Sequence, residues 1–383
     1  MRTFSVPVLA VVCSLGAAPV YAATLDEWVL PLGARELDVD ASLGPQIAFI
    51  QGPTGVIDMF TPAVSVLTHW TVGPAVLQFV VAGQIQSHAD AAGRRFVFVT
   101  DAPHNRIGML DISGARYDFW NIPIAPARRP HALAVDHPTG QVWFTTYDGV
   151  SPPAVAVLDP PSGTIRSWTL PAALAVPANQ IDGIVVTRAS GVLLVYVAIP
   201  QRNELLEIDP VALTARVWPL RFGRPTRIAV NSAGEIFAPN ATSNLMLRFR
   251  PLINQETLWF DGAFTFAPYV STDSTGTPFL PAANAGTPFV ANLNPVGGLV
   301  TPVSPGAFVP VFVPIVTATN VVPAIATNVA LPMISPAIAP VGPAPFTHWA
   351  VPGNGPLSCD PTSALRDAWY INLAMNRISR LRP

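Results

Sequence analysis

Three side chains, Asp101, His131 and Asp182, offer the groups that a metal-assisted acid–base reaction needs. Carboxylate oxygens bind hard cations such as Mg²⁺ or Ca²⁺, and an imidazole can accept a proton. We therefore predict Asp101 and His131 as catalytic residues, and Asp101, Asp182 and His131 as metal ligands, provided that the fold brings them together. Asp182, His104 and Arg227 are predicted to contact a ligand. The alternative is that these polar side chains merely line a water-filled channel.

Several other chemistries are excluded by composition. All 21 basic residues are Arg, so a Schiff-base lysine is absent. The chain has no phosphate-binding glycine-rich loop, no Gly-x-Ser-x-Gly elbow and no Cys-x-x-Cys pair. The net charge of -2 gives no field that would favour nucleic acid. We expect no nucleic-acid partner.

A repeat of roughly 45 residues must position the candidate residues. Each unit ends in a Trp followed by an aliphatic residue, usually with Pro close behind. Successive spacings between these Trp residues are 42, 50, 48, 50, 41 and 90. A period in this range, with short apolar segments, is typical of β-propeller blades or a solenoid. The repeated residues are Trp28, Trp70, Trp120, Trp168, Trp218, Trp259 and Trp349.

The unit at residues 130–171 predicts four short strands separated by Gly, Pro and Asp turns, which is one antiparallel blade. The two chain ends complement each other. Residues 26–31 resemble an isolated outer strand, and residues 369–381 resemble a blade that lacks one. Pairing them would close the ring and remove two exposed edges. We therefore predict an all-β fold, a β-propeller of seven to eight four-stranded blades closed by the N-terminal strand.

The 90-residue spacing leaves the number of blades open. No charged residue lies between Asp273 and Asp360, and prolines are dense there. Residues 289–302 and 327–331 resemble strands, which would give an eighth blade. The alternative is seven blades with an uncharged, Pro/Ala/Val-rich insertion within the degenerate stretch at about 268–345. Residues 304–345 would then be a candidate contact surface for a partner.

Blade geometry places the start of each inner strand and the end of each second strand on the same face. The inner strands start near Gln86, His131, Asp182, Thr226 and Leu357. The second strands end near Asp101, Thr146, Ile199, Asn240 and Asn372. His137 is predicted in a turn on the opposite face. His88 lies in or beside an inner strand and His104 in a loop near Asp101, so either could join the channel site.

The N-terminus resembles a secretory signal peptide over residues 1–23, followed by a single propeller over residues 24–383. Arg2 precedes an apolar stretch, and Ala22 ends a small-x-small cleavage pattern. The apolar stretch is too short for a membrane span, so we expect a secreted or periplasmic protein that is not transmembrane. Cys359 would be the one cysteine left after cleavage, which excludes an intramolecular disulfide.

Two segments, residues 98–111 and 142–145, resemble the repeat of the virginiamycin B lyase (streptogramin lyase) family, and Asn376-Arg377-Ile378 matches its third strand. The resemblance implies a propeller and, in the lyases, metal-assisted elimination that opens a cyclic ester with His and Glu residues. Here Thr146 stands where the family repeat has Glu, and only Asp101 keeps an acid. We therefore expect an exported binding protein for a protein, peptide or glycan. The alternative is a divergent metal-dependent lyase, hydrolase or lactonase that acts on a cyclic ester in the channel.

Overall fold

The computed structural model describes residues 23–31, 34, 36–40, 46–51, 56–72, 84–122, 129–147, 152–168, 170, 181–221, 224–240, 244–262, 264–285, 287–294, 298–310, 315–317, 320–330, 333–334, 337–338, 340–341, 346–353, 355–359, 366–373 and 375–383. The predicted signal peptide lies outside these residues except for Ala23. In the described part of the chain, no helix is long and apolar enough to cross a membrane.

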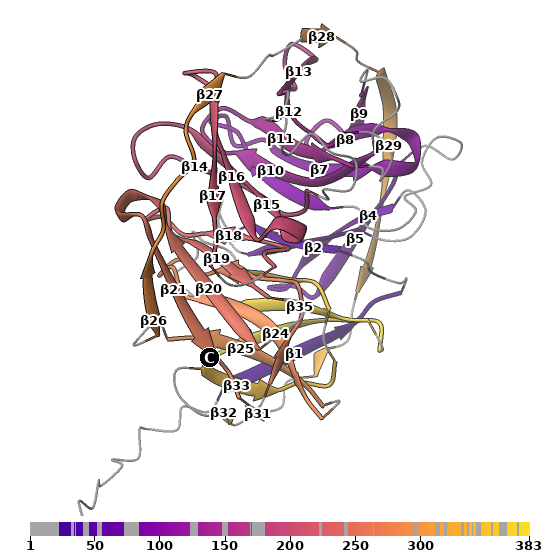
Figure 1. Cartoon of the computed structure of the whole chain (residues 1–383). Helices are drawn as coiled ribbons and strands as arrows, with labels where there is room; N and C mark the ends of the chain where they lie inside the picture. Colours follow the sequence, from indigo (N-terminus) through magenta and orange to yellow (C-terminus); the bar gives the residue numbers. More distant parts are fainter. Residues whose placement is uncertain are drawn as a thin grey trace, which may run out of the picture.

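Seven antiparallel blades form a β-propeller (Figure 1). Blade 1 contains β2 (Glu36–Asp40), β3 (Ile47–Gln51), β4 (Val56–Thr61) and β5 (Val66–Val72). Blade 2 contains β6 (Ile85–Ala89), β7 (Arg95–Asp101), β8 (Arg106–Asp111) and β9 (Arg116–Asn121). Blade 3 contains β10 (Pro130–Asp136), β11 (Gln141–Thr146), β12 (Ala154–Asp159) and β13 (Thr164–Trp168). Blade 4 contains β14 (Ile184–Thr187), β15 (Leu194–Ile199), β16 (Glu204–Asp209) and β17 (Thr214–Pro219).

The remaining blades follow the same plan. Blade 5 contains β18 (Ala229–Val230), β19 (Ile236–Pro239), β20 (Leu245–Arg250) and β21 (Gln255–Phe260). Blade 6 contains a broken inner strand, β22 (Thr265–Phe266) and β23 (Ser271–Thr272), then β24 (Pro278–Asn284), β25 (Thr287–Leu293) and β33 (Phe346–Ala350). Blade 7 contains β34 (Leu357–Cys359), β35 (Ala368–Asn372), β36 (Arg377–Arg382) and β1 (Ala23–Val29). The inner strands contact one another in blade order, and β34 contacts β2.

The first and last strands of the chain pair in blade 7. β1 is antiparallel to β36 over six residue pairs, from Thr24–Arg382 to Val29–Arg377. Asn376 extends the pairing, because its amide donates to the carbonyl of Leu30 at 2.8 Å and its own carbonyl accepts from Leu30 N at 2.9 Å. Asn105 makes the same exchange with Ile122 in blade 2. Both Asn residues have a positive φ, which Asn tolerates better than most residues.

The 90-residue spacing arises from an insertion that runs around the outside of the propeller. We call residues 299–341 the belt. It leaves blade 6 between β25 and β33 and adds a fifth strand, always antiparallel, to each blade in turn. Its strands are β26 (Leu299–Pro302) on blade 5, β27 (Val309–Pro310) on blade 4, β28 (Ile315–Thr317) on blade 3, β29 (Asn320–Ala330) on blades 2 and 1, β30 (Met333–Ile334) and β31 (Ala337–Ile338) on blade 7, and β32 (Pro340–Val341) on blade 6.

The seven-blade alternative is therefore correct, and the eight-blade alternative is wrong. Residues 289–293 do form the third strand of blade 6 as expected, within β25. Residues 299–302 are not its fourth strand but the belt strand of blade 5. Residues 327–330 lie in β29, against β5. Figure 1 shows the belt strands β26 to β29 at the outer margin of the molecule. Proline fits such outer strands, since an edge position tolerates the loss of an N–H donor.

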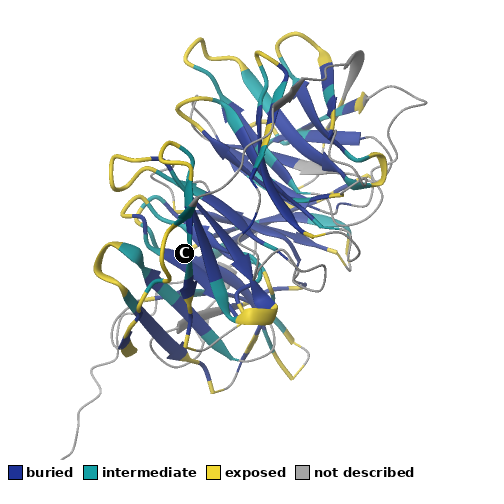
Figure 2. Cartoon of the chain, turned by 45° about the horizontal axis from the view of Figure 1, so that its top comes forward, coloured by how far each residue is buried: buried dark blue, intermediate teal, exposed yellow. Residues whose placement is uncertain are grey.

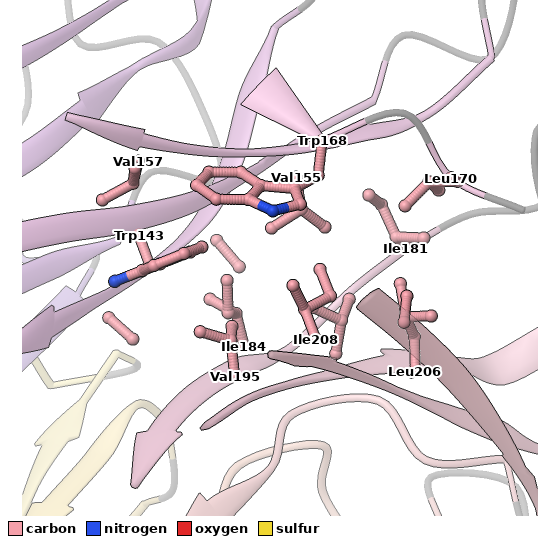
Figure 3. Close-up of a cluster of buried hydrophobic side chains, with 14 of the residues drawn as sticks. Trp143, Val155, Val157, Trp168, Leu170, Ile181, Ile184, Val195, Leu206 and Ile208 are labelled. Atoms are coloured by element: carbon pink, nitrogen blue, oxygen red, sulfur yellow. The ribbon is translucent and has the colours of Figure 1, made fainter. Parts of the chain in front are cut away.

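Most strand residues are buried (dark blue in Figure 2), and aromatic and aliphatic side chains make up most of the buried core. All seven repeated Trp residues are buried in the fourth strands of their blades, which confirms that they serve packing. Figure 3 shows the contact of blades 3 and 4, where Trp143 and Trp168 lie 4.7 Å apart between ring centroids. Val155 from blade 3 and Ile208 from blade 4 belong to the same cluster. The packed blades provide a rigid wall around the axis of the ring.

Candidate functional site

A central cavity of about 700 Å³ is lined by the inner strand of every blade. Its wall runs along the full length of β2, from Glu36 to Asp40. We call the end at which the inner strands begin the proximal mouth, and the end at which they finish the distal mouth. A cavity of this size on the axis of a propeller can hold a small ligand.

Side chains from five blades surround the proximal mouth: Glu36 of blade 1, His131 of blade 3, Asp182 of blade 4, Arg227 of blade 5 and Tyr269 of blade 6. Each lies at the start of an inner strand or just before it. The repeat therefore brings together residues that are far apart in sequence. The predicted residues His131, Asp182 and Arg227 belong to this group.

Arg227 connects opposite sides of the mouth. Its guanidinium donates to Glu36 at 2.9 Å and lies over the ring of Tyr269, 5.1 Å from the ring centroid. Burial raises the pKa of the Glu36 carboxyl, and Arg227 only partly opposes this effect. Burial also disfavours the charge on Arg227, but Glu36, Tyr269 and Asp182 together raise its pKa. Burial raises the pKa of Tyr269 as well. The guanidinium thus stays charged beside an acid that is easily protonated.

His131 and Asp182 face each other across blades 3 and 4. Nδ1 of His131 lies 3.6 Å from Oδ1 of Asp182, which is too far for a hydrogen bond. This Nδ1 is buried and has no hydrogen-bond partner in the described part of the chain. Burial lowers the pKa of His131, and Arg227 adds to that effect while Asp182 opposes it. The imidazole is therefore neutral at neutral pH and available as a proton acceptor or hydrogen-bond partner.

Asp101 and His104 form a separate group inside blade 2. The Asp101 carboxylate is fully buried and accepts hydrogen bonds from Nδ1 of His104, at 2.8 Å, and from Nε of Arg106. Arg106 stands directly opposite Asp101 in the pairing of β7 with β8. His104 follows in the short helix η1 (Ala102–His104). The predicted proximity of His104 to Asp101 is confirmed, but the contacts of Asp101 with His104 and Arg106 hold the β7–β8 turn.

The described side chains at the proximal mouth include two of the three predicted metal ligands, His131 and Asp182. Within the ranges described above, no group of three or more His, Cys, Asp or Glu side chains is placed to hold a metal ion. His131 and Asp182 supply two groups, and Asp101 interacts with His104 and Arg106 instead. The roles predicted for Asp101, His131 and Asp182 as ligands of Mg²⁺ or Ca²⁺ stay predictions.

Blades 1 and 6 contribute residues that the sequence did not reveal. In β2, acidic and aliphatic residues alternate, so Leu37 and Val39 pack in the core while the three acids alternate with them. Asp38, in the middle, accepts hydrogen bonds from the backbone N and Oγ of Ser87, both at 2.6 Å. Burial raises the pKa of Asp38 to about 7, and among the described residues no cation lowers it. The alternation of acidic and aliphatic residues in Glu-Leu-Asp-Val-Asp is the sequence signal that could have identified this strand and its acids.

Comparisons with known proteins place the fold. No protein-family model and no curated protein sequence matches the chain. Among solved structures, virginiamycin B lyase from Staphylococcus aureus superposes with a TM-score of 0.64 at 12% identity, over 94% of this chain and 99% of that one. A streptogramin B lyase structure gives a TM-score of 0.65 at 12% identity, over 94% of this chain and 97% of that one.

A third structure, the extracellular domain of a one-component system from B. thetaiotaomicron, gives a TM-score of 0.50 at 10% identity. The match covers 93% of this chain and 39% of that one. Identities this low are informative about fold alone. The resemblance noted in the sequence is thus confirmed as a fold: the chain is a seven-bladed β-propeller similar in architecture to the virginiamycin B lyases.

Proposed function

We propose that this chain is an exported binding protein whose channel takes a small ligand that carries a basic group. The observation that supports this most directly is the cavity of about 700 Å³, lined by all seven inner strands. Pockets of this size suit small molecules and short peptides rather than folded proteins. Among the classes expected from the sequence, the cavity favours a short peptide over a protein.

Asp38 supports the choice of a basic group. Its carboxyl lines the cavity, is half-buried, and accepts hydrogen bonds from Ser87. Burial holds its pKa at about 7, so protonation competes with ionisation near neutral pH. An ammonium group placed beside it would favour the ionised carboxylate. At the proximal mouth, Arg227 and Tyr269 offer a hydrogen-bond donor and an aromatic face to the rest of the ligand.

Export rests on the N-terminal sequence. Arg2, the apolar residues 8–18 and the small residue Ala22 form the pattern of a cleaved signal peptide, so we place the protein outside the cytoplasm, secreted or periplasmic. Expression of the full chain followed by N-terminal sequencing of the exported product tests this. A mature N-terminus at Ala23 or Thr24 supports export. A protein that stays in the cytoplasm with residues 1–22 attached contradicts it.

Calorimetric titration of the mature chain with trialanine, N-acetyl-trialanine and maltotriose tests the binding function. We expect trialanine to bind more tightly than its acetylated form and maltotriose to bind most weakly. Affinity for trialanine should rise between about pH 6 and pH 8 as Asp38 ionises. Asp38→Asn should remove both the amine preference and the pH dependence. Asp159→Asn, at the end of β12 in blade 3, is the matched control. If none of the three probes binds, the proposal fails.

A lyase or hydrolase that acts on a cyclic ester is the second candidate. It is favoured by His131, whose neutral imidazole lies 3.6 Å from Asp182 at the mouth, and by the fold shared with streptogramin lyases. His131 would accept the proton, and Asp182 would orient its ring. Incubation with a streptogramin B-type depsipeptide, with and without Mg²⁺, tests this candidate. Ring opening that His131→Ala abolishes would support it, and an intact substrate would exclude it.

A further inference from the structure

Two histidines meet at the distal mouth, the end of the channel opposite His131. His88 is the fourth residue of β6 in blade 2, and His137 directly follows β10 in blade 3. His137 lines the central cavity, is exposed, and is open to solvent. His88 is only 6% exposed. Neither residue takes part in the binding function proposed above, so this site stands or fails independently.

The two imidazoles point their Nδ1 atoms at each other. These nitrogens are 3.5 Å apart, with ring centroids at 5.7 Å and an angle of 37° between the ring planes. Two nitrogens bound to one tetrahedral zinc at 2.0–2.1 Å lie about 3.4 Å apart. The observed separation of 3.5 Å is close to this value. A direct hydrogen bond between the two rings at 3.5 Å would be long and weak.

The surroundings fix His88 in this orientation. Its ring stacks on Phe96 at 6.2 Å with an interplanar angle of 20°. On the other side, Gly140 approaches Nε2 so closely that an added Cβ would lie 3.2 Å from it. Gly140 also has a φ of +71°, which favours glycine at this turn. Nδ1 of His88 is therefore held toward His137, whose own Nδ1 lies 3.5 Å away.

The electrostatics suit a cation. Burial lowers the pKa of His88, with His137 adding to the effect, so the ring is neutral at neutral pH, which is the form that binds metals. Asp40, Asp90 and Asp136 lie close enough to act on His88 in the opposite sense. Asp136 is bound by Arg188 through two contacts of 2.9 and 2.7 Å, and Asp90 is bound by Arg94. The arginine partners keep Asp136 and Asp90 from being direct ligands and offset part of their negative potential.

We propose that His88 and His137 bind a divalent transition metal ion such as Zn²⁺ at the distal mouth, through their two Nδ1 atoms. Imidazole nitrogens favour Zn²⁺, Cu²⁺ and Ni²⁺ over Mg²⁺ and Ca²⁺, which prefer oxygen. Water fills the remaining coordination positions. Those positions face the channel and the solvent, so the site can accept a further ligand there.

Calorimetry and thermal unfolding of the tag-free mature chain, with ZnCl₂ and with MgCl₂, test the proposal. We expect micromolar zinc affinity with a raised melting temperature, and no response to magnesium. His137→Gln, in an exposed turn, should weaken zinc binding by more than roughly tenfold without changing the fold. His88→Gln should do the same. His69→Gln, whose ring is bound to Asp58 in blade 1, is the matched control and should bind zinc as the wild type does.

Electron paramagnetic resonance of the Cu²⁺ complex gives an independent measurement. Two coordinating nitrogens should be visible in the wild-type spectrum, and one in that of His137→Gln. Zinc affinity that is unchanged in His137→Gln, or no binding by the wild type at millimolar zinc, would overturn the proposal. Loss of binding in His131→Gln but not in His137→Gln would place the ion at the proximal mouth and would likewise contradict it.

Discussion

At the scale of single residues, the ion pair of Glu36 and Arg227 is the contact that most directly ties distant blades together. The two residues are 191 positions apart and belong to blades 1 and 5, yet their side chains meet at 2.9 Å. Both are well shielded from water, so each charge depends on the other for compensation. The raised pKa of Glu36 indicates that Arg227 does not fully offset the cost of burying the carboxylate. The pair therefore contributes little net stability, and its main effect is to hold blades 1 and 5 in place at the proximal mouth.

Arg227→Gln should destabilise the protein by about 3 kcal/mol near pH 8, because Glu36 would be left buried without a counter-charge. The loss should shrink as the pH falls, because the raised pKa of Glu36 favours its protonation. Urea unfolding near pH 8 and at lower pH measures both effects. The double variant Glu36→Gln/Arg227→Gln should recover most of the stability. An Arg227→Gln protein with the wild-type midpoint near pH 8 would contradict this account.

Sequence patterns predicted about half of the proximal mouth. His131, Asp182 and Arg227 were accessible because their blades carry the full Trp-anchored repeat. Glu36 and Tyr269 were missed because the alignment of inner strands omitted blades 1 and 6, where the repeat is weakest. Asp101 shows a different limit: its strand end was located, but the cross-strand position of Arg106, which captures the carboxylate, depends on register.

At the scale of elements, the belt extends the pairing of every blade. Each outer strand of a propeller has a free edge, and an exposed edge invites pairing with other chains. Here that edge is paired with belt strands that carry no charged residue and many prolines. Val303 even donates to the carbonyl of Asn254 at 2.8 Å, as Ile122 does to Asn105 in blade 2. The belt thus makes with blade 5 the same backbone hydrogen bond that the fourth strand makes with the third-strand turn in blade 2.

The pairing register of β25 and β33 in blade 6 shows where the belt can be deleted without changing either strand. Leu293 of β25 stands directly opposite Phe346 of β33, so residues 294–345 can be replaced by an Asn-Gly turn. We expect the four-stranded blades to persist, with unchanged far-UV circular dichroism. The melting temperature should fall by on the order of 5–10 °C through the lost strand pairing.

Size-exclusion chromatography should show self-association of the deletion variant, because the outer edges become free. Asn328→Ala, which removes only the 2.8 Å bond from Thr68, is the control and should behave as the wild type. A deletion variant that fails to fold would mean that the belt is needed to form the blades. One with wild-type stability and no association would mean that the belt strands contribute nothing.

The sequence located the belt but did not predict its path. An uncharged, proline-dense segment marked the departure from the repeat. Strands of two to four residues have too little periodicity to be recognised, and their partners are set by the curvature of the finished ring. β29 is an exception in length, at eleven residues, because it pairs with two blades in succession. The sequence alone does not show this long-range pairing, and without it the same residues are equally compatible with an eighth blade.

At the scale of the whole molecule, burial of carboxyl groups should control how stability depends on pH. Burial raises the pKa of Asp38 to about 7 and the pKa values of Asp58 and Asp367 to about 6, and it also raises that of Glu36. Between their ordinary pKa values and these raised ones, the folded protein keeps protons that the unfolded chain has lost. The stability that these groups contribute is therefore present below about pH 4 and is lost as the pH rises toward 7.

The histidines act in the opposite direction over a narrower window. Burial lowers the pKa values of His88 and His131, so their contribution is present above about pH 6.5 and is lost as the pH falls through their folded-state pKa values. The lowered pKa of Asp136 matters only below about pH 4. The three carboxyls with pKa values of about 6 to 7 change the stability more than the two histidines do, so we expect maximal stability at about pH 5.

Urea unfolding between about pH 4 and pH 8 measures this balance. The free energy of unfolding should fall on the alkaline side, and Asp38 alone should account for on the order of 2 kcal/mol of the decline, since its side chain is only half-buried. Asp38→Asn should flatten the decline and should be more stable than the wild type near about pH 8. Asp159→Asn, at the end of β12, should leave the profile unchanged. A wild-type stability that rises toward pH 8 would contradict this account. It would mean that water or a bound cation already stabilises the charge on these buried carboxyls. Asp38 would then be ionised before a basic ligand binds.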